Sequence, residues 1–144
     1  MTVEDNIALH IPASVERLEE ARAFVGARAE ALGVPPTLTM KLDLVLEELL
    51  VNVGSYAYPD GGGDLEICCS VESDDSDGSG SFCLRLCDWG VHFDPLAKDD
   101  PDVQADMDER TVGGLGIFLA TQMADECSYT RKGNRNEFKA CFSF

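Results

Sequence analysis

Two stretches of alternating apolar residues, joined by a short polar segment, constrain the fold of this chain more than any other feature. In residues 65–72 every second side chain is apolar, and the members of this face are Leu65, Ile67, Cys69 and Val71. The second stretch repeats the pattern with Phe82, Leu84 and Leu86. A period of two predicts strands with one buried face, and the intervening SDDSDGSG predicts a hairpin turn. Continuing the count places Asp88 on the buried face.

Asp88 is therefore predicted to point inward at the end of a strand, where it opens the segment DWGVHFDP. A carboxylate on an apolar face is unfavourable unless a hydrogen-bond donor reaches it. The exocyclic amine of adenine is such a donor, whereas guanine presents an acceptor there, so Asp88 could select the base. Gly90 would leave space for that base. The alternative is that Asp88 caps a local turn.

Two longer segments repeat apolar residues at helical spacing. Residues 15–32 follow Ser14, a favoured N-cap residue, and end before Gly33, which favours the end of a helix. Residues 35–58 open with two prolines and carry a second apolar stripe, which predicts another long helix. Segregated helices and hairpin-like strands favour a fold of two packed layers.

The remaining patterns complete this fold. A strand is expected at residues 6–12, a helix at 113–127, a turn at 132–136 and a strand from Phe138 to Phe144. The order of elements predicts an α+β fold: a two-layer α/β sandwich with a mixed, mainly antiparallel sheet and helices on one face. Residues 1–144 fit a single domain, since the sequence has no internal repeat and no linker.

Glu48 and Asn52, four residues apart in LEELLVN, lie one turn above the other on the same side of the second predicted helix. A carboxylate at this edge could accept a proton from a hydroxyl group or from water. An amide oxygen could bind Mg²⁺, which prefers hard oxygen ligands. The alternative for this pair is a solvated helix face.

A polar segment and a glycine-rich turn follow Asp88. Residues 97–112 have no sustained apolar period and are long for a connector, which favours a functional loop or lid. In GGLGIF, three glycines precede or begin a predicted helix: Gly113, Gly114 and Gly116. Free backbone N–H groups and the helix dipole favour phosphate at such a position. The alternative is a flexible start of a helix.

Charge and composition exclude several classes of partner. The net charge is −16, so the chain would repel the phosphates of nucleic acid. No apolar run approaches the roughly 20 residues that a membrane-spanning helix needs, and the N-terminus lacks the pattern of a secretory signal. The expected location is the cytoplasm, with neither nucleic acid nor membrane as a direct partner. The six cysteines would then stay reduced, which argues against a disulfide framework.

Together, EELLVN, DWGVHFDP and GGLGIF resemble the N, G1 and G2 boxes of the GHKL ATP-binding superfamily, in the same order and with a polar lid before the third. The stretch ERTVGGLGIFLATQMADECSYTRKGNRNEF is similar to the small bacterial anti-sigma serine/threonine kinases and their partner-switching relatives. The resemblance extends from about Leu38 to Phe142. The fold it implies is a helix-and-sheet sandwich that binds ATP between its layers.

The resemblance also implies a role for each motif. Glu48 would be the general base, and Asn52 would be the Mg²⁺ ligand. Asp88 with Gly90 would form the adenine site. Arg110 could reach the phosphates from the lid and compensate for a missing basic residue, because a guanidinium stabilises charge on a transferring phosphoryl group. The alternative for Arg110 is a solvated charge amid Asp106, Asp108 and Glu109. The phosphate end of the site would be shaped by the glycines of the third box: Gly113, Gly114 and Gly116.

The function implied is a Mg²⁺-ATP-dependent protein serine/threonine kinase that phosphorylates an anti-sigma-factor antagonist and sequesters a sigma factor; a homodimer is compatible with it. Many relatives carry basic residues where this chain has Ser55 and Tyr56. Their absence motivates an alternative, an ATP-binding interaction module with little or no phosphoryl transfer. A third interpretation, the detached ATPase domain of a sensor histidine kinase, is weaker because dimerisation helices and a phospho-acceptor histidine are not recognisable.

Overall fold

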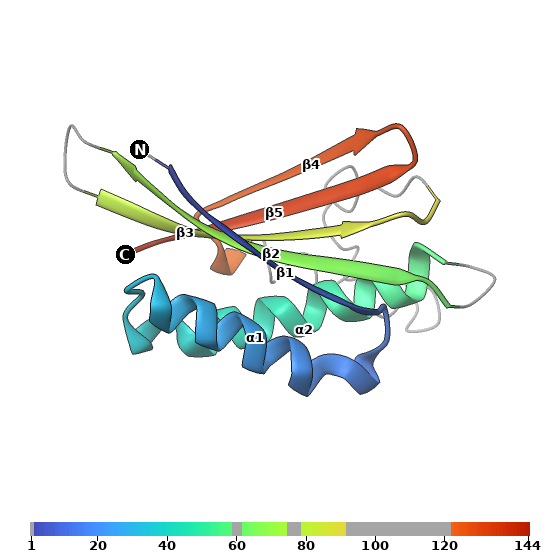
Figure 1. Cartoon of the computed structure of the whole chain (residues 1–144), viewed down its shortest axis with the longest axis horizontal. Coiled ribbons are helices and arrows are strands. Elements are labelled where there is room, and N and C mark those ends of the chain that lie inside the picture. The colour runs from blue at the N-terminus through green and yellow to red at the C-terminus, as the bar shows by residue number, and fades with distance from the viewer. Residues whose placement is uncertain (1, 59–61, 75–78, 92–121) are drawn as a thin grey trace, which may run out of the picture.

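The computed structural model describes residues 2–58, 62–74, 79–91 and 122–144 (Figure 1). Its helices and strands, in chain order, are β1 (Thr2–Pro12), α1 (Leu18–Ala31), α2 (Thr39–Tyr56), β2 (Asp64–Asp74), β3 (Ser79–Asp88), β4 (Glu126–Lys132) and β5 (Arg135–Ser143). Short 3-10 turns at Val15–Arg17 and Pro36–Leu38 lead into the two helices. The two long predicted helices and the predicted pairing of β2 with β3 are confirmed.

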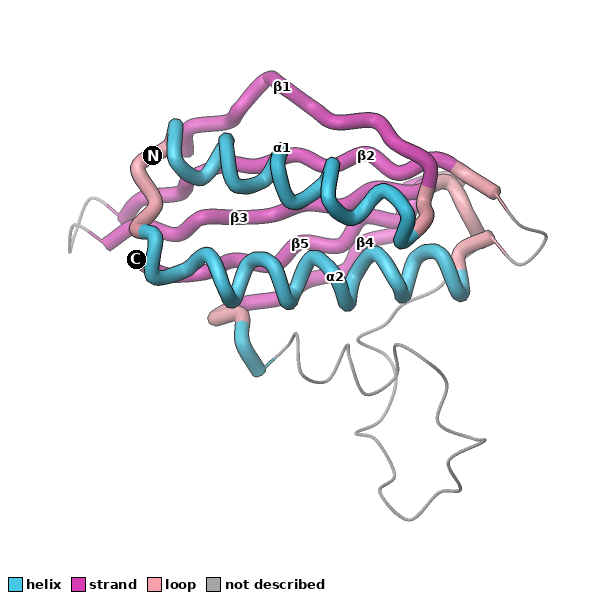
Figure 2. Tube along the Cα trace, turned by 90° about the horizontal axis from the view of Figure 1, so that it is seen from below, coloured by secondary structure: helices cyan, strands magenta, loops and turns pink. Residues whose placement is uncertain are grey.

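The five strands form one sheet in the order β1-β2-β3-β5-β4, and every described pairing is antiparallel. Both helices lie against the same face of this sheet, as Figure 1 shows from the side and Figure 2 from below. The predicted α+β class, a two-layer sandwich with helices on one face, is confirmed. The opposite face, which α1 and α2 do not cover, is named the open face. The side chains of β2, β3 and β5 that lie on it include Glu66, Cys68, Glu72, Cys83, Arg85, Cys87, Glu137, Lys139 and Cys141.

The core lies between the sheet and the helices and follows the predicted alternation. Phe82 and Phe142, from the neighbouring strands β3 and β5, and Leu46 and Leu50, from α2, are among the largest fully buried side chains. Burying a side chain of this size contributes roughly 1.5–3 kcal/mol. The apolar stripe of α2 is thus used against the sheet. Among the described residues, no helix has both the length and the hydropathy that crossing a bilayer requires.

The first helix begins later than its sequence pattern predicts. The Ser14 hydroxyl accepts a hydrogen bond from the Glu16 backbone N–H at 3.2 Å, but the residues that it caps form a 3-10 turn, and α1 starts at Leu18. Gly33 has a φ of 82°, the left-handed conformation that commonly ends helices. The cap and the stop were therefore predicted correctly, and only the first turn differs.

Strand β1 departs from the predicted alternation. The sequence predicts Ile7 on the buried face together with Leu9 and Ile11, but Ile7 is 51% exposed whereas Ile11 is 4% exposed. The register of β1 against β2 shifts between Glu4 and Ala8. An irregularity of this kind interrupts the alternation of side chains, which places Ile7 outside the core.

Strand β4 was not predicted, and its presence corrects two sequence predictions. The helix expected at residues 113–127 extends too far, because β4 begins at Glu126. The turn expected at residues 132–136 narrows to two residues, of which the first is Gly133 with a φ of 60°. Glycine at this position is typical of a type II′ hairpin turn. As a result Asn136 lies inside β5 instead of in a turn.

One cysteine pair corrects the prediction that the thiols stay reduced. Cys83 and Cys141 are 58 residues apart in sequence but directly opposite each other on β3 and β5, and they form a disulfide. Directly paired residues of neighbouring strands place their side chains on the same face. The register of the sheet, which sequence spacing does not reveal, brings the two sulfurs together. The free cysteines of the described residues are Cys68, Cys69, Cys87 and Cys127.

Candidate functional site

A small pocket opens where α2 meets the ends of β3 and β5. The described residues that line it are Leu49, Asn52, Val53, Leu86, Asp88, Tyr129, Asn136 and Phe138. Within the described part of the chain, the buried polar or charged residues are Asn52, Asp88 and Asn136, with exposures of 3%, 6% and 3%. All three line this pocket. Since burying polar groups is costly unless they are paired, their convergence marks the pocket as the candidate site.

The predicted inward direction of Asp88 is confirmed, and the carboxylate has two donors. Asp88 Oδ1 accepts hydrogen bonds from the Gly90 backbone N–H at 2.9 Å and from Asn136 Nδ2 at 2.8 Å. The bond from Gly90 is the local cap considered as the alternative in the sequence analysis. Recognition of adenine by Asp88 stays a prediction. Gly90 and Asn136 thus donate to the same oxygen, Oδ1. They fix the orientation of the carboxylate at the edge of the pocket.

Asn136 is the site residue that the sequence analysis missed. Its Nδ2 also donates to the Val91 backbone oxygen at 2.8 Å, and its Oδ1 accepts from the Tyr129 hydroxyl at 2.5 Å and from Arg131 Nη1 at 3.1 Å. With the bond to Asp88, both ends of the amide are hydrogen-bonded. The signal that could have revealed Asn136 is its parity with Phe138, which places it on the buried face of β5.

Arg131 connects β4 to the chain that follows β3. Its Nη1 donates to the Gly90 backbone oxygen at 2.8 Å as well as to Asn136, and its Nε donates to the Gly133 backbone oxygen at 3.0 Å. Bonds from an ionised donor are stronger than bonds between neutral groups. The guanidinium therefore holds the turn at Gly90 against the two C-terminal strands.

The conformation at Gly90 also depends on the end of α2. A Cβ on Gly90 would lie 2.1 Å from the Ala57 backbone oxygen, so no larger residue fits without a shift of the backbone. The same Ala57 oxygen accepts a hydrogen bond from the Val91 N–H at 2.8 Å. This close approach is a reason for the glycine that the sequence did not reveal. A role for Gly90 in leaving space for adenine stays a prediction.

Tyr58 links the same region to β2. Its hydroxyl donates to the Asp64 backbone oxygen at 2.6 Å and accepts from the Trp89 N–H at 2.9 Å. Burial, as the largest cause, raises the pKa of the Tyr58 hydroxyl above its ordinary value. The hydroxyl therefore stays protonated at neutral pH and can keep donating to Asp64. Tyr58 thus holds the end of β3 beside the end of α2.

Asn52 supplies an acceptor with no partner among the described residues. Its Oδ1 is buried and accepts no hydrogen bond from any residue that the structure describes. An orphaned buried oxygen carries a desolvation penalty, and Mg²⁺ in proteins is bound by oxygens of this kind. Asn52 therefore fits the Mg²⁺ that the sequence resemblance implies.

Glu48 lies one helical turn before Asn52 on α2 and is not among the described lining residues. Burial raises the pKa of the Glu48 carboxyl, and repulsion from Glu47 raises it further. A raised pKa suits a carboxylate that accepts a proton near neutral pH. The structure thus joins Asn52 and Asp88 in one pocket and places Glu48 one helical turn from Asn52 on α2.

The remaining predicted site residues lie outside the described part of the chain. These are the lid at residues 97–112 with Arg110, and the glycines Gly113, Gly114 and Gly116. Their expected roles at the phosphate end stay predictions.

Comparison with known families decides what kind of pocket this is. A family model described as histidine kinase-like ATPase domain matches residues 11–142. The chain belongs to this family. The match includes α1, α2 and the sheet from the end of β1 onward, so the pocket between α2 and the sheet is part of a histidine kinase-like ATPase domain. No curated protein sequence matches the chain.

Two solved structures have the same fold as this histidine kinase-like ATPase domain. One contains the RsbU and RsbW domains of Rv1364c from Mycobacterium tuberculosis, with a TM-score of 0.53, 14% identity, and coverage of 96% of this chain and 33% of that one. The chain thus spans about a third of that protein's structure. The other is the SiaB-SiaC complex from Pseudomonas aeruginosa, with a TM-score of 0.50, 17% identity, and coverage of 96% and 90%. Both likenesses concern the fold.

Proposed function

We propose that this protein is a Mg²⁺-ATP-dependent serine/threonine kinase that acts as an anti-sigma regulatory factor and phosphorylates an anti-sigma-factor antagonist. The observation that carries the proposal is the pocket of the histidine kinase-like ATPase domain. There the orphaned Oδ1 of Asn52 lines the same space as the fixed carboxylate of Asp88. One group suits a cation and the other suits a base amine, which together match the two ends of Mg²⁺-ATP.

Asp88 is the proposed adenine ligand. Because Gly90 and Asn136 both donate to Oδ1, the carboxylate is held in one orientation before nucleotide binds. A carboxylate held in this way accepts from the exocyclic amine of adenine, and it opposes the carbonyl oxygen that guanine has at that position. Preorganisation of this kind lowers the entropic cost of binding.

Asn52 is the proposed Mg²⁺ ligand, through its Oδ1. The ion supplies neutralisation of phosphate charge, which matters for a chain with a net charge of −16. On our proposal, Gly113, Gly114 and Gly116 bind the phosphates through backbone N–H groups, and Arg110 approaches them from the lid.

Glu48 is the proposed general base. Its raised pKa improves its ability to accept the proton of a serine or threonine hydroxyl as the phosphoryl group is transferred. Most of the rate enhancement would come from positioning and from charge stabilisation, as in other phosphoryl transfers.

The proposed partners are proteins. The compared structures pair an RsbW domain with an RsbU domain in one chain, and SiaB with SiaC in a complex. By analogy we propose an antagonist protein as phosphoryl acceptor. A sigma factor as the sequestered partner and a homodimer as the working form are proposed from the sequence resemblance alone. The cytoplasm is the proposed location, because ATP and sigma factors are both found there.

The kinase proposal is tested by incubating the protein with labelled Mg²⁺-ATP and candidate antagonist proteins. Glu48→Gln is compared with the wild type, and Glu47→Gln is the matched control from the neighbouring residue. We expect Glu48→Gln to lower transfer by roughly 100-fold or more while ATP binding stays unchanged. Glu47 pairs with Arg22 at 3.1 Å in a partly exposed ion pair, so its change should alter transfer by less than about threefold.

Two results would overturn parts of this assignment. Wild-type transfer rates in Glu48→Gln would remove Glu48 as the base. Tight ATP binding without transfer to any candidate would instead favour the ATP-binding interaction module, which Ser55 and Tyr56 already motivate by replacing basic residues of relatives.

Nucleotide selection is a separate test of the adenine site. In Asp88→Ala, ATP affinity should fall by roughly 10- to 100-fold, because a hydrogen bond to a charged group is lost. Circular dichroism of the variant controls for folding. Equal affinity of the wild-type protein for GTP and ATP would contradict the role of Asp88.

A further inference from the structure

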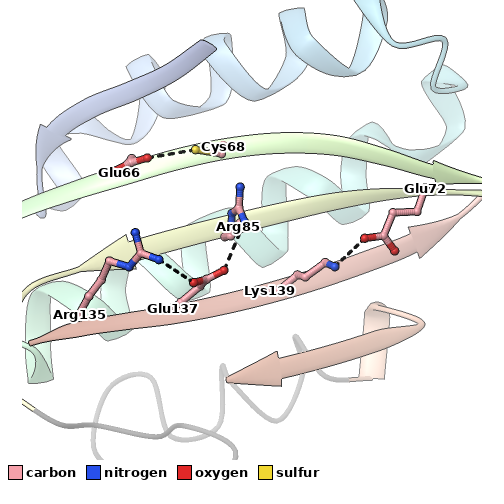
Figure 3. Close-up of polar contacts among 7 residues, drawn as sticks. All are labelled: Glu66, Cys68, Glu72, Arg85, Arg135, Glu137 and Lys139. Atoms are coloured by element: carbon pink, nitrogen blue, oxygen red, sulfur yellow. Dashed lines mark hydrogen bonds and ion pairs between the residues drawn. The ribbon is translucent and has the colours of Figure 1, made fainter. Parts of the chain in front are cut away.

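The open face carries a group of side chains that the proposed kinase does not use. Figure 3 shows paired charges across β2, β3 and β5, in which Glu137 accepts from Arg85 at 3.4 Å and from Arg135 at 3.1 Å. In the same view Lys139 contacts Glu72 at 2.7 Å. These contacts use charged residues that the structure leaves partly exposed. The disulfide between Cys83 and Cys141 lies on the same face and is the exception.

Cys83 and Cys141 are nearly inaccessible although neither of the described helices α1 and α2 covers them. Their exposures are 1% and 6%. One further potential metal ligand reaches them: a carboxylate oxygen of Glu72 and the two sulfurs all lie within 4.8 Å of one another. Three strands, β2, β3 and β5, contribute one ligand each. The ligand atoms therefore converge because of the sheet register and not because of any local sequence motif.

We propose that Cys83, Cys141 and Glu72 form a Zn²⁺ site when the disulfide is reduced. Two thiolates and one carboxylate are a donor set that suits Zn²⁺, with water in the fourth tetrahedral position. With Zn–S distances of about 2.3 Å, tetrahedral geometry places two ligand sulfurs about 3.8 Å apart. The two sulfurs are bonded to each other in the disulfide and must move apart once it is reduced. A carboxylate oxygen of Glu72 already lies within 4.8 Å of both, so binding needs side-chain adjustment without a change of register.

Lys139 supports the proposed site in two ways: it orients the Glu72 carboxylate, and it balances the charge of three anionic ligands around a divalent cation. Its ammonium holds the carboxylate of Glu72 at 2.7 Å from the side. Groups outside the ligand set that hydrogen-bond a metal-binding carboxylate orient it, and they also tune metal affinity. Two thiolates, one carboxylate and Zn²⁺ carry a net charge of −1, which the positive charge of Lys139 offsets.

Opening the site requires two electrons. A dithiol reductant transfers two electrons and two protons to the bond between Cys83 and Cys141, leaving two thiols, and is itself oxidised to a disulfide. Zn²⁺ then replaces the two thiol protons, which pass to the solvent or buffer. The oxidised protein cannot bind the ion in this way, so metal binding and the disulfide exclude each other.

Cys68 provides a matched control on the same face. Its Sγ donates to Glu66 Oε1 at 3.3 Å, and it is not part of the ligand group. Cys68→Ser therefore changes a thiol on the open face while leaving the proposed ligands in place.

The experiment uses the full chain, reduced with a phosphine and freed of metal, and titrates it with Co²⁺ and then with Zn²⁺ against a chromophoric chelator. We expect one Co²⁺ per chain, with the charge-transfer absorption of a cobalt–thiolate bond, and displacement of Co²⁺ by Zn²⁺. Cys83→Ser and Cys141→Ser should each abolish the absorption. Glu72→Gln should weaken Zn²⁺ binding at least about tenfold, and Cys68→Ser should bind like the wild type.

Four outcomes would overturn the site. The first is a disulfide that no reductant opens in the folded protein. The second is a reduced protein that gives no cobalt–thiolate absorption. The third is absorption that persists in Cys83→Ser or disappears in Cys68→Ser. Glu72→Gln keeps both cysteines and the disulfide, so unaltered Zn²⁺ affinity in this variant would also contradict the proposal even if the serine variants fold poorly.

Discussion

The polar residues on the two faces of the sheet differ in burial and in the kind of contact they make. On the face that the helices cover, the buried polar residues among those described gather at one pocket, where Asn136 donates a short hydrogen bond to Asp88. On the open face, residues next to them in the same strands, such as Glu137, form ion pairs that solvent reaches. Neighbouring residues of one strand point to opposite faces, so Asn136 belongs to the site while Glu137, the next residue, forms ion pairs at the surface.

This contrast has an energetic basis. A buried donor or acceptor that loses its partner keeps its full desolvation cost, whereas an exposed ion pair can be replaced by water at little cost. Substitutions of polar residues on the covered face should therefore lower the free energy of unfolding strongly, and substitutions on the open face should lower it weakly. The disulfide between Cys83 and Cys141 is the expected exception.

The largest effect on stability should come from this exception. In a Cys83→Ser, Cys141→Ser double variant, the free energy of unfolding should fall by about 2–5 kcal/mol relative to the oxidised protein, because the cross-link no longer restricts the unfolded chain. Urea unfolding of both proteins under oxidising conditions measures the difference. Under reducing conditions the wild type and the double variant should have similar free energies of unfolding. If the difference stayed unchanged, the cross-link would not be its cause.

The second effect tests the contrast between the faces directly. Asn136→Ala removes the donor to Asp88 and to the Val91 oxygen and should lower the free energy of unfolding by about 2–4 kcal/mol. Lys139→Ala, on the open face of the same strand, should cost less than about 1 kcal/mol, since its ion pair with Glu72 is partly exposed. Equal losses in the two variants, measured by urea unfolding, would abolish the distinction.

A smaller effect is expected at the junction of α2 with the strands. Tyr58→Phe keeps the ring and removes the hydroxyl that bonds Asp64 and Trp89, so the free energy of unfolding should fall by about 1–2 kcal/mol. Because these bonds hold the end of β3, amide hydrogen exchange at Trp89 and Val91 should also become faster. Unaltered exchange there would mean that Tyr58 does not restrain this segment.

The smallest effect concerns the ionisation of Glu48. Its pKa is raised in the folded protein, so its contribution to stability is fully present below the ordinary value of 4.5 and is lost as pH rises through the raised pKa. As pH rises from about 4 through the raised pKa, the wild-type protein should therefore lose stability relative to Glu48→Gln. Urea unfolding across this range checks the sign, with the exposed Glu16→Gln as control. An advantage of the wild type that grows with pH would contradict it.

The sequence predicted the features that depend on local periodicity. The alternation in β2 and β3, together with the helical spacing in α1 and α2, was enough to define the fold class. Counting along β3 was enough to predict that Asp88 points inward. Helical spacing was enough to place Glu48 and Asn52 one turn apart on α2. In each case a short stretch of chain contains the whole signal.

The features that the sequence did not predict depend on contacts between distant segments. Asn136 was assigned to a turn because Gly133 and its neighbours resemble a longer loop, and only the tight hairpin puts it beside Asp88. The pairing of Cys83 with Cys141 follows from the register of β3 against β5. Parity with Phe138 gives the face of Asn136, but the partners that these residues meet leave no periodic trace, since they belong to segments far away in the chain.

The packing of Tyr58 against Gly63 has a consequence for how the family could vary. A Cβ at Gly63 would come within 2.1 Å of the Tyr58 ring, so the aromatic ring occupies the space that any other residue at position 63 would need. The two positions are expected to change together in descendants of this sequence. In a descendant with a small side chain at position 58, residues larger than glycine should be tolerated at position 63. In a descendant that keeps Tyr58, position 63 should remain glycine.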